Sequence, residues 1–432
     1  MKKINIGIIG FGTIGAGVIK ALLSRRAFLR EKCGVDLSVT MICDKDLKTK
    51  RPVKVSRKIM TKLLTKVLYD PRINIVVELM GGVKPAKDVV MQALREGKHV
   101  VTANKALLSD SGREIFGLAG KLGLCVGFEA SVGGGIPIIR SLKEGFVADK
   151  IELIYGIING TSNFILSKMA EEGLDFGSAL SIAQAKGYAE RDPFLDISGG
   201  DSCHKLSILA MLGFGAWVKP AEIYTEGITC IEPVDIQYAK DMGYAIKLLA
   251  IAKRSSGGLL ELRVHPTFIP DSHLLANVKG VYNGIFVKGD LAGENLFYGQ
   301  GAGALPTSSA VVSDIVSIAR SISAEGKSKS YAAAFSDDTI RLKNMDDVKT
   351  KHYVRFSTVD KPGVLAKVSG ILAKYDISIA SVTQKVKKST NTVPIVMMTH
   401  NALEKNMAGA LKEINALSQI KKKTVRVRVE DQ

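Results

Sequence analysis

The sequence has few of the residues that build metal centres and cross-linked scaffolds. Its five cysteines are scattered, odd in number and without a Cys-x-x-Cys pair, so neither a disulfide framework nor a zinc site is predicted. The six histidines are equally dispersed along the chain.

Long apolar stretches are also missing. No run of about 18 apolar residues occurs, so a membrane span is not predicted. The N-terminus passes directly into strand-like sequence without an apolar core segment, which argues against a signal peptide. We therefore expect a cytoplasmic protein with no membrane partner.

Aromatic residues make up only 6% of the chain, which bears on the meaning of its net charge of +18. A basic protein is a candidate nucleic-acid binder, but here the lysines are spread along the whole chain rather than clustered. We expect no nucleic-acid partner, and we infer a surface that favours anionic small molecules.

The remaining composition is that of a globular protein. Of its 432 residues, 46% are apolar and 24% are charged. A chain of this length is longer than a typical single domain, so we predict about two to four domains.

The first motif follows an apolar strand predicted over residues 3–9. The glycine-rich turn consists of Gly10, Phe11, Gly12, Thr13, Ile14 and Gly15. An amphipathic helix follows at once, and strand, glycines and helix in this order predict a dinucleotide-binding turn. The glycines allow the close approach of a pyrophosphate, and the helix N-terminus offers amide donors.

A second strand, predicted over residues 35–43, ends at Asp44. An acid at this place binds the ribose 2′-hydroxyl of NAD in such folds. Seven lysines and arginines follow between residues 45 and 58, and such a run suits the 2′-phosphate of NADP or a solvated loop. The choice between NAD and NADP stays open.

Two further strand ends carry polar groups. The strand that begins at His99 is followed by Thr102, Asn104 and Lys105, where the reactive end of a cofactor is expected in an open parallel sheet. A strand over residues 124–129 leads into three glycines at 133–135, which suit an anion, a monovalent cation held by carbonyls, or a tight domain crossover.

From residue 151 the pattern changes. A strand at 151–158 leads to a polar turn at 159–163, where Thr161 or Ser162 is predicted to cap a helix. The next loop is acidic and runs into a helix with a lysine near its start. The acids of this stretch are Glu190, Asp192, Asp196 and Asp201, and the lysine is Lys205.

Asp201 and Lys205 are four residues apart and share a face of that helix, either as a plain ion pair or as a site. Cys203 is rotated away from this face and is predicted to lie in the core. A lysine near a cofactor can donate a proton to a carbonyl oxygen or polarise it, and carboxylates hold a cationic or hydroxyl-bearing substrate. These groups suggest an amino-acid-like substrate that carries a carbonyl or an alcohol.

The rest of the chain predicts a return to the first domain and then a separate tail. Strands are expected at 264–268 and 280–287, and a glycine-rich loop at 299–307 leads into a helix to about residue 320. A linker is expected over 324–350. The tail has the order strand, helix, strand, strand, helix, strand, which is the ferredoxin-like plan, with an Asp-Lys-Pro-Gly turn from Asp360 to Gly363 that suits a ligand or a purely structural turn.

Seven motifs in this order resemble those of bacterial homoserine dehydrogenases with a C-terminal regulatory ACT domain. They are found at residues 10–15, 101–105, 128–137, 159–163, 187–193, 200–206 and 301–307. The resemblance covers nearly the whole chain.

The resemblance implies reversible NAD(P)-dependent interconversion of L-aspartate 4-semialdehyde and L-homoserine, in the pathway to threonine and methionine. It implies that Lys205 is the acid/base and that Lys105 assists at the carbonyl. The substrate-binding set would be Glu190, Asp196, Asp201, Gly160 and Thr161.

The same resemblance implies the remaining ligands. The cofactor would be bound by the turn at residues 10–15 with Asp44, Thr102, Asn104, Lys105 and Gly301, and a sodium ion by the main-chain carbonyls of Glu129, Val132, Gly134 and Ile136. ACT domains resemble amino-acid sensors, so L-threonine is the expected effector near Asp360, Gly363 and Val364. An ACT domain used only for assembly is the alternative.

We therefore expect an α/β protein with a Rossmann-type parallel sheet, an α+β substrate and dimerisation domain, and a ferredoxin-like ACT domain. The expected boundaries are 1–135 with about 303–322, then 136–302, a linker at 324–350, and 351–432. A homo-oligomer, either a dimer or a tetramer, is expected. The rival functions are a dehydrogenase for another amino-acid aldehyde and a non-catalytic amino-acid-sensing protein.

Overall fold

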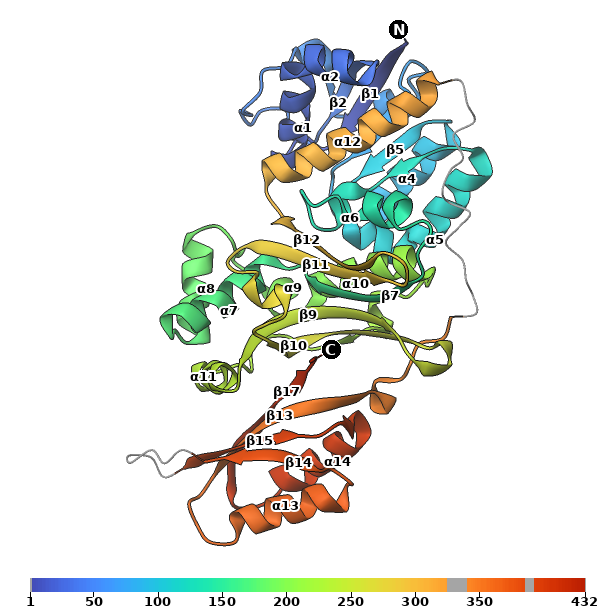
Figure 1. Ribbon diagram of the computed structural model, residues 1–432. Helices are drawn as coiled ribbons and strands as arrows, with labels where there is room; N and C mark the ends of the chain where they lie inside the picture. Colours follow the sequence, from blue (N-terminus) through green and yellow to red (C-terminus); the bar gives the residue numbers. More distant parts are fainter. Residues whose placement is uncertain (1, 325–339, 385–391, 432) are drawn as a thin grey trace. The chain divides into compact units, whose positions relative to one another are not determined.

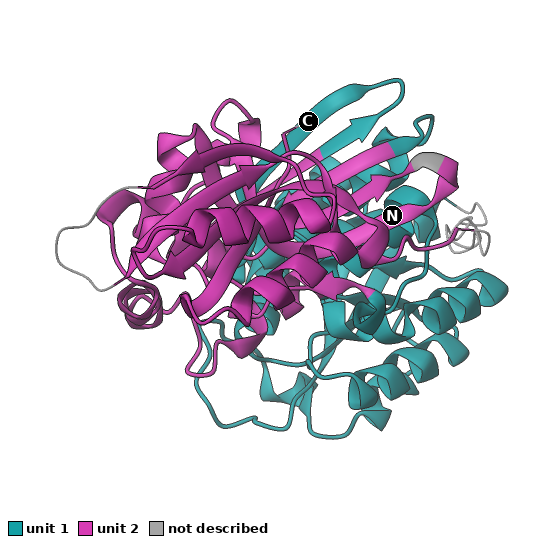
Figure 2. Ribbon diagram, turned by 90° about the horizontal axis from the view of Figure 1, so that it is seen from below, with its two compact units in different colours: residues 1–151, 204–222, 287–339 teal, residues 152–203, 223–286, 340–432 magenta. Residues whose placement is uncertain are grey.

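The computed structural model describes residues 2–324, 340–384 and 392–431. These residues form two compact units, which Figure 2 colours separately. The first consists of residues 1–151, 204–222 and 287–339, and the second of residues 152–203, 223–286 and 340–432.

The first unit contains a parallel sheet whose described strands follow the order β3-β2-β1-β4-β5-β6. The strands are β1 (Lys3–Ile9), β2 (Asp36–Cys43), β3 (Met60–Thr61), β4 (Ile75–Glu78), β5 (His99–Thr102) and β6 (Val126–Gly127). This is the doubly wound order, with the change of direction between β1 and β4, where ligands bind beyond the strand ends. The Rossmann-type fold predicted from the sequence is confirmed.

Helices cover this sheet. They are α1 (Thr13–Ser24), α2 (Arg26–Cys33), α3 (Thr65–Leu68), α4 (Lys84–Arg95), α5 (Lys105–Leu122), α6 (Ile138–Arg140) and α12 (Ala304–Ser323), and the unit also includes strand β12 (Gly293–Gln300) and most of α10 (Gly200–Phe214). Helix α12 lies alongside α1 (Figure 1), and its Val311 and Ile315 join Ile6 and Ile8 of β1 in one apolar core. The predicted return of the chain to the first domain is confirmed.

The second unit is built on a mixed sheet. Its strands run in the order β11-β7-β9-β10-β17-β13-β15-β14, with β8 beside β10 and β16 beside β13. The strands are β7 (Ile151–Ile157), β8 (Tyr224–Thr225), β9 (Tyr244–Arg254), β10 (Leu260–Pro270), β11 (Tyr282–Gly289), β13 (Lys349–Thr358), β14 (Ile379–Thr383), β15 (Val393–Thr399), β16 (Ala402–Leu403) and β17 (Ile420–Val429). The sequence did not predict β8, β9 or β16.

The helices of this unit are α7 (Gly160–Glu172), α8 (Phe176–Ala185), α9 (Phe194–Ile197), α11 (Pro233–Asp241), α13 (Val364–Lys374) and α14 (Glu404–Asn415). In the C-terminal part, α13 and α14 pack on one face of β13 and β15 through a core that includes Val354, Phe356, Val368 and Met407. The predicted ferredoxin-like order of the tail is confirmed.

The tail does not have a sheet of its own. Strand β17 pairs in parallel with β10 at Thr267–Arg428 and Phe268–Val429, so the strands of the tail extend the sheet that contains β7, β9 and β10. Of the expected linker, residues 325–339 lie outside the described residues. Its later part is tied to β10, because Leu260 N donates to Arg341 O at 2.9 Å and Lys343 N donates to Leu260 O at 2.9 Å.

A buried carboxylate secures the other face of the tail sheet to α11. Asp235 is fully buried, and it accepts hydrogen bonds from Arg355 Nε at 2.6 Å, Arg355 Nη2 at 2.9 Å and Tyr353 OH at 2.8 Å. It also caps α11 by accepting from Glu232 N at 2.9 Å. One side chain therefore satisfies an arginine, a tyrosine and a helix end.

We predict that Asp235→Ala destabilises this unit by about 3–5 kcal/mol, because it leaves the buried Arg355 without its main carboxylate. The shift of the urea unfolding midpoint, followed by circular dichroism, measures the loss. Glu232→Gln is the matched control: this residue also lies 3.1 Å from Arg355, but its side chain is 48% exposed, and about 1 kcal/mol or less is expected. Equal losses in the two variants would contradict this account.

Candidate functional site

The glycine turn after β1 is shaped by close main-chain packing. Gly10 has a left-handed φ of 106°, and a Cβ placed on it would lie 2.4 Å from Leu79 O. A Cβ on Gly15 would lie 2.1 Å from Gly10 O, whereas nothing lies within 4 Å of a Cβ on Gly12. Gly12 is also the N-cap of α1, with no side-chain cap bond. The turn is therefore closed on its inner side and open where a helix N-terminus can receive a pyrophosphate.

Two groups of opposite charge adjoin this turn. Asp44, after β2, accepts hydrogen bonds from Phe11 N and, at 2.7 Å, from Asp46 N. Arg51 lies with its guanidinium 5.9 Å from the centre of the Phe11 ring and 3.4 Å from Asp46 Oδ2. The basic run thus brings at least one arginine to the turn beside the acid.

The polar residues after β5 hold a turn together. Thr102 Oγ1 donates to Glu78 Oε2 at 2.7 Å, and Asn104 Nδ2 donates to Gly82 O at 2.6 Å. Asn104 Oδ1 accepts from Leu107 N at 3.0 Å and so caps α5, which begins at Lys105. In this structure Thr102 and Asn104 place Lys105 at the first position of a helix that starts at the end of a central strand.

A side-chain contact links α5 to α10. Ser109, one turn after Lys105, lies with Oγ 2.7 Å from His204 Nδ1, and His204 precedes Lys205. The two helices that carry the predicted catalytic lysines therefore meet near those lysines. Lys205 itself is buried, with 9% of its surface exposed.

The acidic loop is organised by Asn159, a residue that the sequence had not singled out. Its Nδ2 donates to Asp196 Oδ1 at 2.7 Å and to Asp201 Oδ2 at 2.8 Å, while its Oδ1 accepts from Ser162 N at 2.8 Å. Asn159 is therefore the N-cap of α7, and the prediction that Thr161 or Ser162 has this role was wrong. The signal was present in the sequence, because asparagine directly before a helix is a favoured cap.

The other predicted substrate residues lie around this group. Thr161 Oγ1 donates to Tyr188 O at 2.6 Å, which ties the start of α7 to the acidic loop. Gly160 lies so close to the chain that a Cβ on it would be 2.7 Å from Val281 O. Glu190 is exposed, and the loop is held there by its main-chain carbonyl, which accepts from Gln184 Nε2 at 3.2 Å.

Cys203 is buried, as predicted. Burial raises the pKa of its thiol, and this environment disfavours the thiolate that a nucleophile needs.

The loop predicted to hold a cation contains the buried carboxylate of Glu129, and it contacts a second buried carboxylate, Asp314 of α12. The Glu129 carboxylate accepts from Ile139 N at 2.8 Å and Arg140 N at 2.9 Å, and Glu129 N donates to Asp314 Oδ2 at 2.8 Å. Burial raises the pKa of Glu129, and it raises that of Asp314 to about 7.

The same loop packs on the second glycine-rich loop. A Cβ on Gly134 would lie 2.5 Å from Gly301 O, and Gly135 N donates to Gln300 O at 3.0 Å. Gly133 and Gly134 both have positive φ, so their carbonyls point in directions unlike those of their neighbours. Across the described ranges, no group of three or more His, Cys, Asp or Glu side chains is arranged to hold a metal. A cation here would therefore depend on main-chain carbonyls such as those of Val132 and Ile136.

In the C-terminal part, the turn from Asp360 leads into α13. Gly363 is the N-cap with a left-handed φ of 84° and no side-chain cap bond, and α13 begins at Val364. The turn thus presents the start of a helix, as the sequence suggested.

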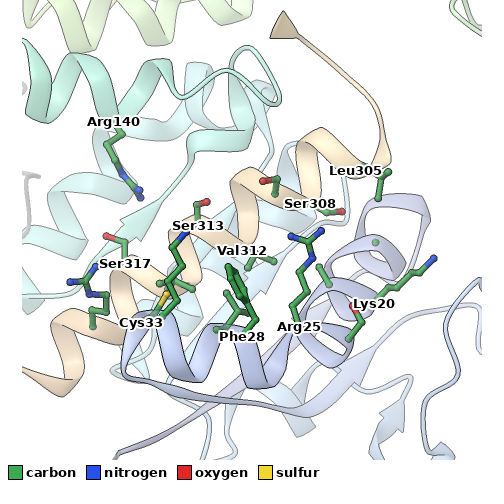
Figure 3. A pocket seen from close by; sticks show the side chains of 18 of the residues that line it. Lys20, Arg25, Phe28, Cys33, Arg140, Leu305, Ser308, Val312, Ser313 and Ser317 are labelled. Carbon is green, nitrogen blue, oxygen red and sulfur yellow. The ribbon is translucent and has the colours of Figure 1, made fainter.

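A groove in the first unit lies apart from the predicted site residues. It has a volume of about 1120 Å³, and it is lined by α1, α2 and α12, with Lys20, Arg25, Phe28 and Ser308 among its walls (Figure 3). No residue predicted for the cofactor, the substrate or the effector lines it.

Three sequence profiles match the chain in order. The homoserine dehydrogenase NAD-binding domain matches residues 10–129, the homoserine dehydrogenase domain matches residues 137–316, and the ACT domain matches residues 352–419. The homoserine dehydrogenase of Neisseria gonorrhoeae is 42% identical over 433 residues, which is 100% of this chain and 99% of that protein. This chain belongs to the homoserine dehydrogenase family.

This chain is also similar to other homoserine dehydrogenases. The protein of Pseudomonas aeruginosa is 41% identical over 100% of this chain and 99% of its own. The crystal structure of a homoserine dehydrogenase from Thiobacillus denitrificans is 43% identical, with a TM-score of 0.91 over 100% of this chain and 99% of that one. A hyperthermophilic archaeal homoserine dehydrogenase in complex with NADPH matches 73% of this chain and 98% of its own, at 26% identity and a TM-score of 0.61.

The chain is accordingly an NAD(P)-dependent oxidoreductase of the homoserine dehydrogenase family with a C-terminal ACT domain. Within the described ranges, every helix falls short of the length and apolar character that crossing a membrane requires.

We predict that Asp314 makes stability depend on pH. Its pKa in the folded protein, about 7, is above the ordinary value of 3.8, so its favourable contribution is complete at low pH and is lost as the pH rises through 7. Asp314→Asn keeps an acceptor for Glu129 N and removes the titration. The melting temperature of the variant minus that of the wild type should therefore increase as the pH is raised from 5 to 8.

The exposed carboxylate variant Glu144→Gln serves as the control, since its side chain is 52% exposed and it lies near the same Arg140. Its melting curve should follow the wild type over the whole pH range. A difference in melting temperature between the wild type and Asp314→Asn that stays constant with pH would show that Asp314 does not titrate as stated.

Proposed function

We propose that the protein catalyses the reversible NAD(P)H-dependent reduction of L-aspartate 4-semialdehyde to L-homoserine, in the biosynthesis of threonine and methionine. The observation that supports this substrate most directly is the pair of carboxylates, Asp196 and Asp201, held by the one amide of Asn159. Two carboxylates held this closely favour a cationic partner, which the α-ammonium group of an amino acid provides.

Helix α10 contains both a carboxylate and a lysine of the proposed site. It begins at Gly200, so Asp201 and Lys205 are four residues apart on one helix. In our proposal the carboxylates Glu190, Asp196 and Asp201 bind the ammonium end with help from Gly160 and Thr161, and Lys205 meets the oxygen at the other end.

The proposed chemistry needs a proton at that oxygen. In the reducing direction Lys205 donates a proton to the former carbonyl oxygen, and in the oxidising direction it accepts the proton of the homoserine hydroxyl. Lys105 stabilises negative charge on the same oxygen. The nicotinamide cofactor, when bound, supplies or accepts the hydride.

The glycine turn fits such a cofactor. Residues 10–15 with Gly301, Thr102 and Asn104 are proposed to line its site, because Gly12 leaves open space at the N-terminus of α1. Asp44 suits the 2′-hydroxyl of NAD and Arg51 suits the 2′-phosphate of NADP, and the archaeal relative was solved with NADPH.

Regulation and assembly are further parts of the proposal. L-threonine is proposed to bind near Asp360, Gly363 and Val364, where the turn presents the N-terminus of α13. A sodium ion is proposed at the carbonyls of residues 129, 132, 134 and 136, where it would stabilise the loop. We further propose a cytoplasmic homo-oligomer.

The decisive test is homoserine-dependent reduction of NAD+ or NADP+, followed by absorbance, in the wild type and in Lys205→Ala. We expect turnover in the wild type and a loss of about 10²–10⁴-fold in kcat in the variant, with nucleotide binding retained. The exposed Lys186 provides the control, and Lys186→Ala should turn over normally. Undiminished turnover of Lys205→Ala would remove Lys205 from the chemistry, and faster oxidation of another amino-acid alcohol would change the proposed substrate.

Cofactor preference can be tested at two residues. Asp44→Ala should weaken the use of NADH more than that of NADPH, and Arg51→Ala should do the reverse, each by about tenfold in kcat/KM because a charged hydrogen bond is lost. Asp36→Ala, at the opposite end of β2, should change neither. Equal losses with both nucleotides in Asp44→Ala would exclude Asp44 from the ribose site.

A further inference from the structure

A cluster of four charged side chains joins β17 to the segment that follows β8. Arg428, which is fully buried, donates from Nη1 to Glu226 Oε2 at 2.8 Å and from Nε to Glu404 Oε1 at 2.6 Å. Arg426 donates from Nη2 to Glu226 Oε1 at 3.2 Å and from Nη1 to Glu404 Oε2 at 3.0 Å. Arg428 also donates to Tyr224 OH at 2.8 Å, and Tyr224 donates to Glu226.

The charges of this cluster balance, with two arginines and two glutamates. Burial opposes the ionisation of Glu226, but the two arginines outweigh it and hold the pKa of this carboxyl below its usual range. Glu226 is thus a carboxylate fixed from two sides by one strand, β17. Arg428 and Glu404 are buried while Glu226 is 33% exposed, and removing a partner would leave the buried charges uncompensated, so the group holds its geometry firmly.

The chain directly after Glu226 lies against the backbone of α9 and its C-terminus. Ile228 N donates to Ile197 O at 2.9 Å. A Cβ on Gly227 would lie 2.2 Å from Ile197 O and 2.7 Å from Ser198 Cα, and a Cβ on Gly199 would lie 3.2 Å from Glu226 O. The two segments touch main chain to main chain, so no flexible side chain between them can absorb a shift.

Helix α9 contains Asp196, one residue before Ile197. The Asp196 carboxylate accepts from Asn159 Nδ2 at 2.7 Å, and its main-chain carbonyl accepts from Ser162 Oγ at 2.9 Å. Direct contacts therefore run from Arg428 to Glu226, from residues 227–228 to Ile197, and from there along the chain to Asp196.

We propose that Glu226 is a positioning residue for the substrate-binding carboxylate Asp196, and that the arginines of β17 fix Glu226 in that role. The proposal rests on the proposed function in one respect, because it takes Asp196 to bind the substrate. It adds that the last strand of the ACT domain takes part in substrate affinity even without an effector. Glu226 acts through residues 227–228 and α9, and it does not touch the substrate.

The test compares Glu226→Gln with Glu261→Gln in the full-length protein. Glu261 is the matched control: it is a buried glutamate of β10, paired with Lys343 at 2.9 Å and Arg263 at 3.3 Å, with no part in the contacts to α9 described above. We expect Glu226→Gln to raise the KM for homoserine about tenfold or more, since a small displacement of a binding group has a large effect, while the KM for the nucleotide stays within about twofold. Glu261→Gln should lower the melting temperature comparably and leave both KM values unchanged.

Hydrogen exchange gives a readout that does not depend on turnover. Amides of residues 194–201 should exchange faster in Glu226→Gln than in the wild type or in Glu261→Gln. If the wild type does not oxidise homoserine, the proposed function is wrong. The exchange rates of residues 194–201 still support or overturn the role of Glu226 in that case, because they do not depend on turnover. Arg426→Gln, which weakens the cluster from β17, should reproduce both effects and serves if Glu226→Gln does not fold. An unchanged KM for homoserine in a folded, active Glu226→Gln variant, or unchanged exchange in residues 194–201, overturns the proposal.

Discussion

In the second unit, β17 lies beside β10 in parallel, and buried charges accompany this short contact. Arg263 of β10 donates from Nη2 to Glu430 Oε1 at 2.5 Å, and Tyr155 OH of β7 donates to Glu430 Oε2 at 2.6 Å. Arg263 and Glu430 are 1% and 6% exposed, so separating the strands would leave desolvated charges without partners. The rest of this unit depends on that junction, because among the described strands the sheet passes from β10 to the strands of the tail through this pairing.

The proposed substrate site also depends on charged groups that a single side chain holds in place. Asn159 uses both hydrogens of one amide for two carboxylates and its oxygen for the cap of α7. Asp196 and Asp201 are therefore held close together in spite of their repulsion, and that repulsion is relieved when a cation binds. Glycine at position 160 lets the chain leave this asparagine without a clash against Val281.

The sequence predicted those features that are local. The turn at residues 10–15, the acid at Asp44, the polar residues and lysine at the end of β5 and the order of elements in the tail all follow from short patterns of glycine, charge and apolar spacing. The long-range contacts were not visible in this way. Nothing in the sequence near Arg428 or Glu430 indicates that they face Glu226 and Arg263, because the register between β17 and β10 is set by packing between residues about 160 apart.

The same limit bears on two of the errors of detail. The cap of α7 was assigned to Thr161 or Ser162 because both are good caps, but Asn159 stands two residues before Thr161 and also satisfies the two aspartates. Strand β9 was missed because its apolar run does not alternate, which is the pattern of a strand buried on both faces. Family resemblance supplied the roles of the lysines, which spacing alone did not determine.

The way β17 is built into the sheet affects how the protein can be engineered. A chain cut before the ACT domain would lose the pairing of β17 with Thr267 and Phe268 of β10, and it would expose free backbone groups there that recruit other strands. Such a fragment would tend to aggregate, and inactivity in it would say nothing about regulation. The proposed response to an effector is better tested through single changes in the turn before α13, which leave the last strand in place.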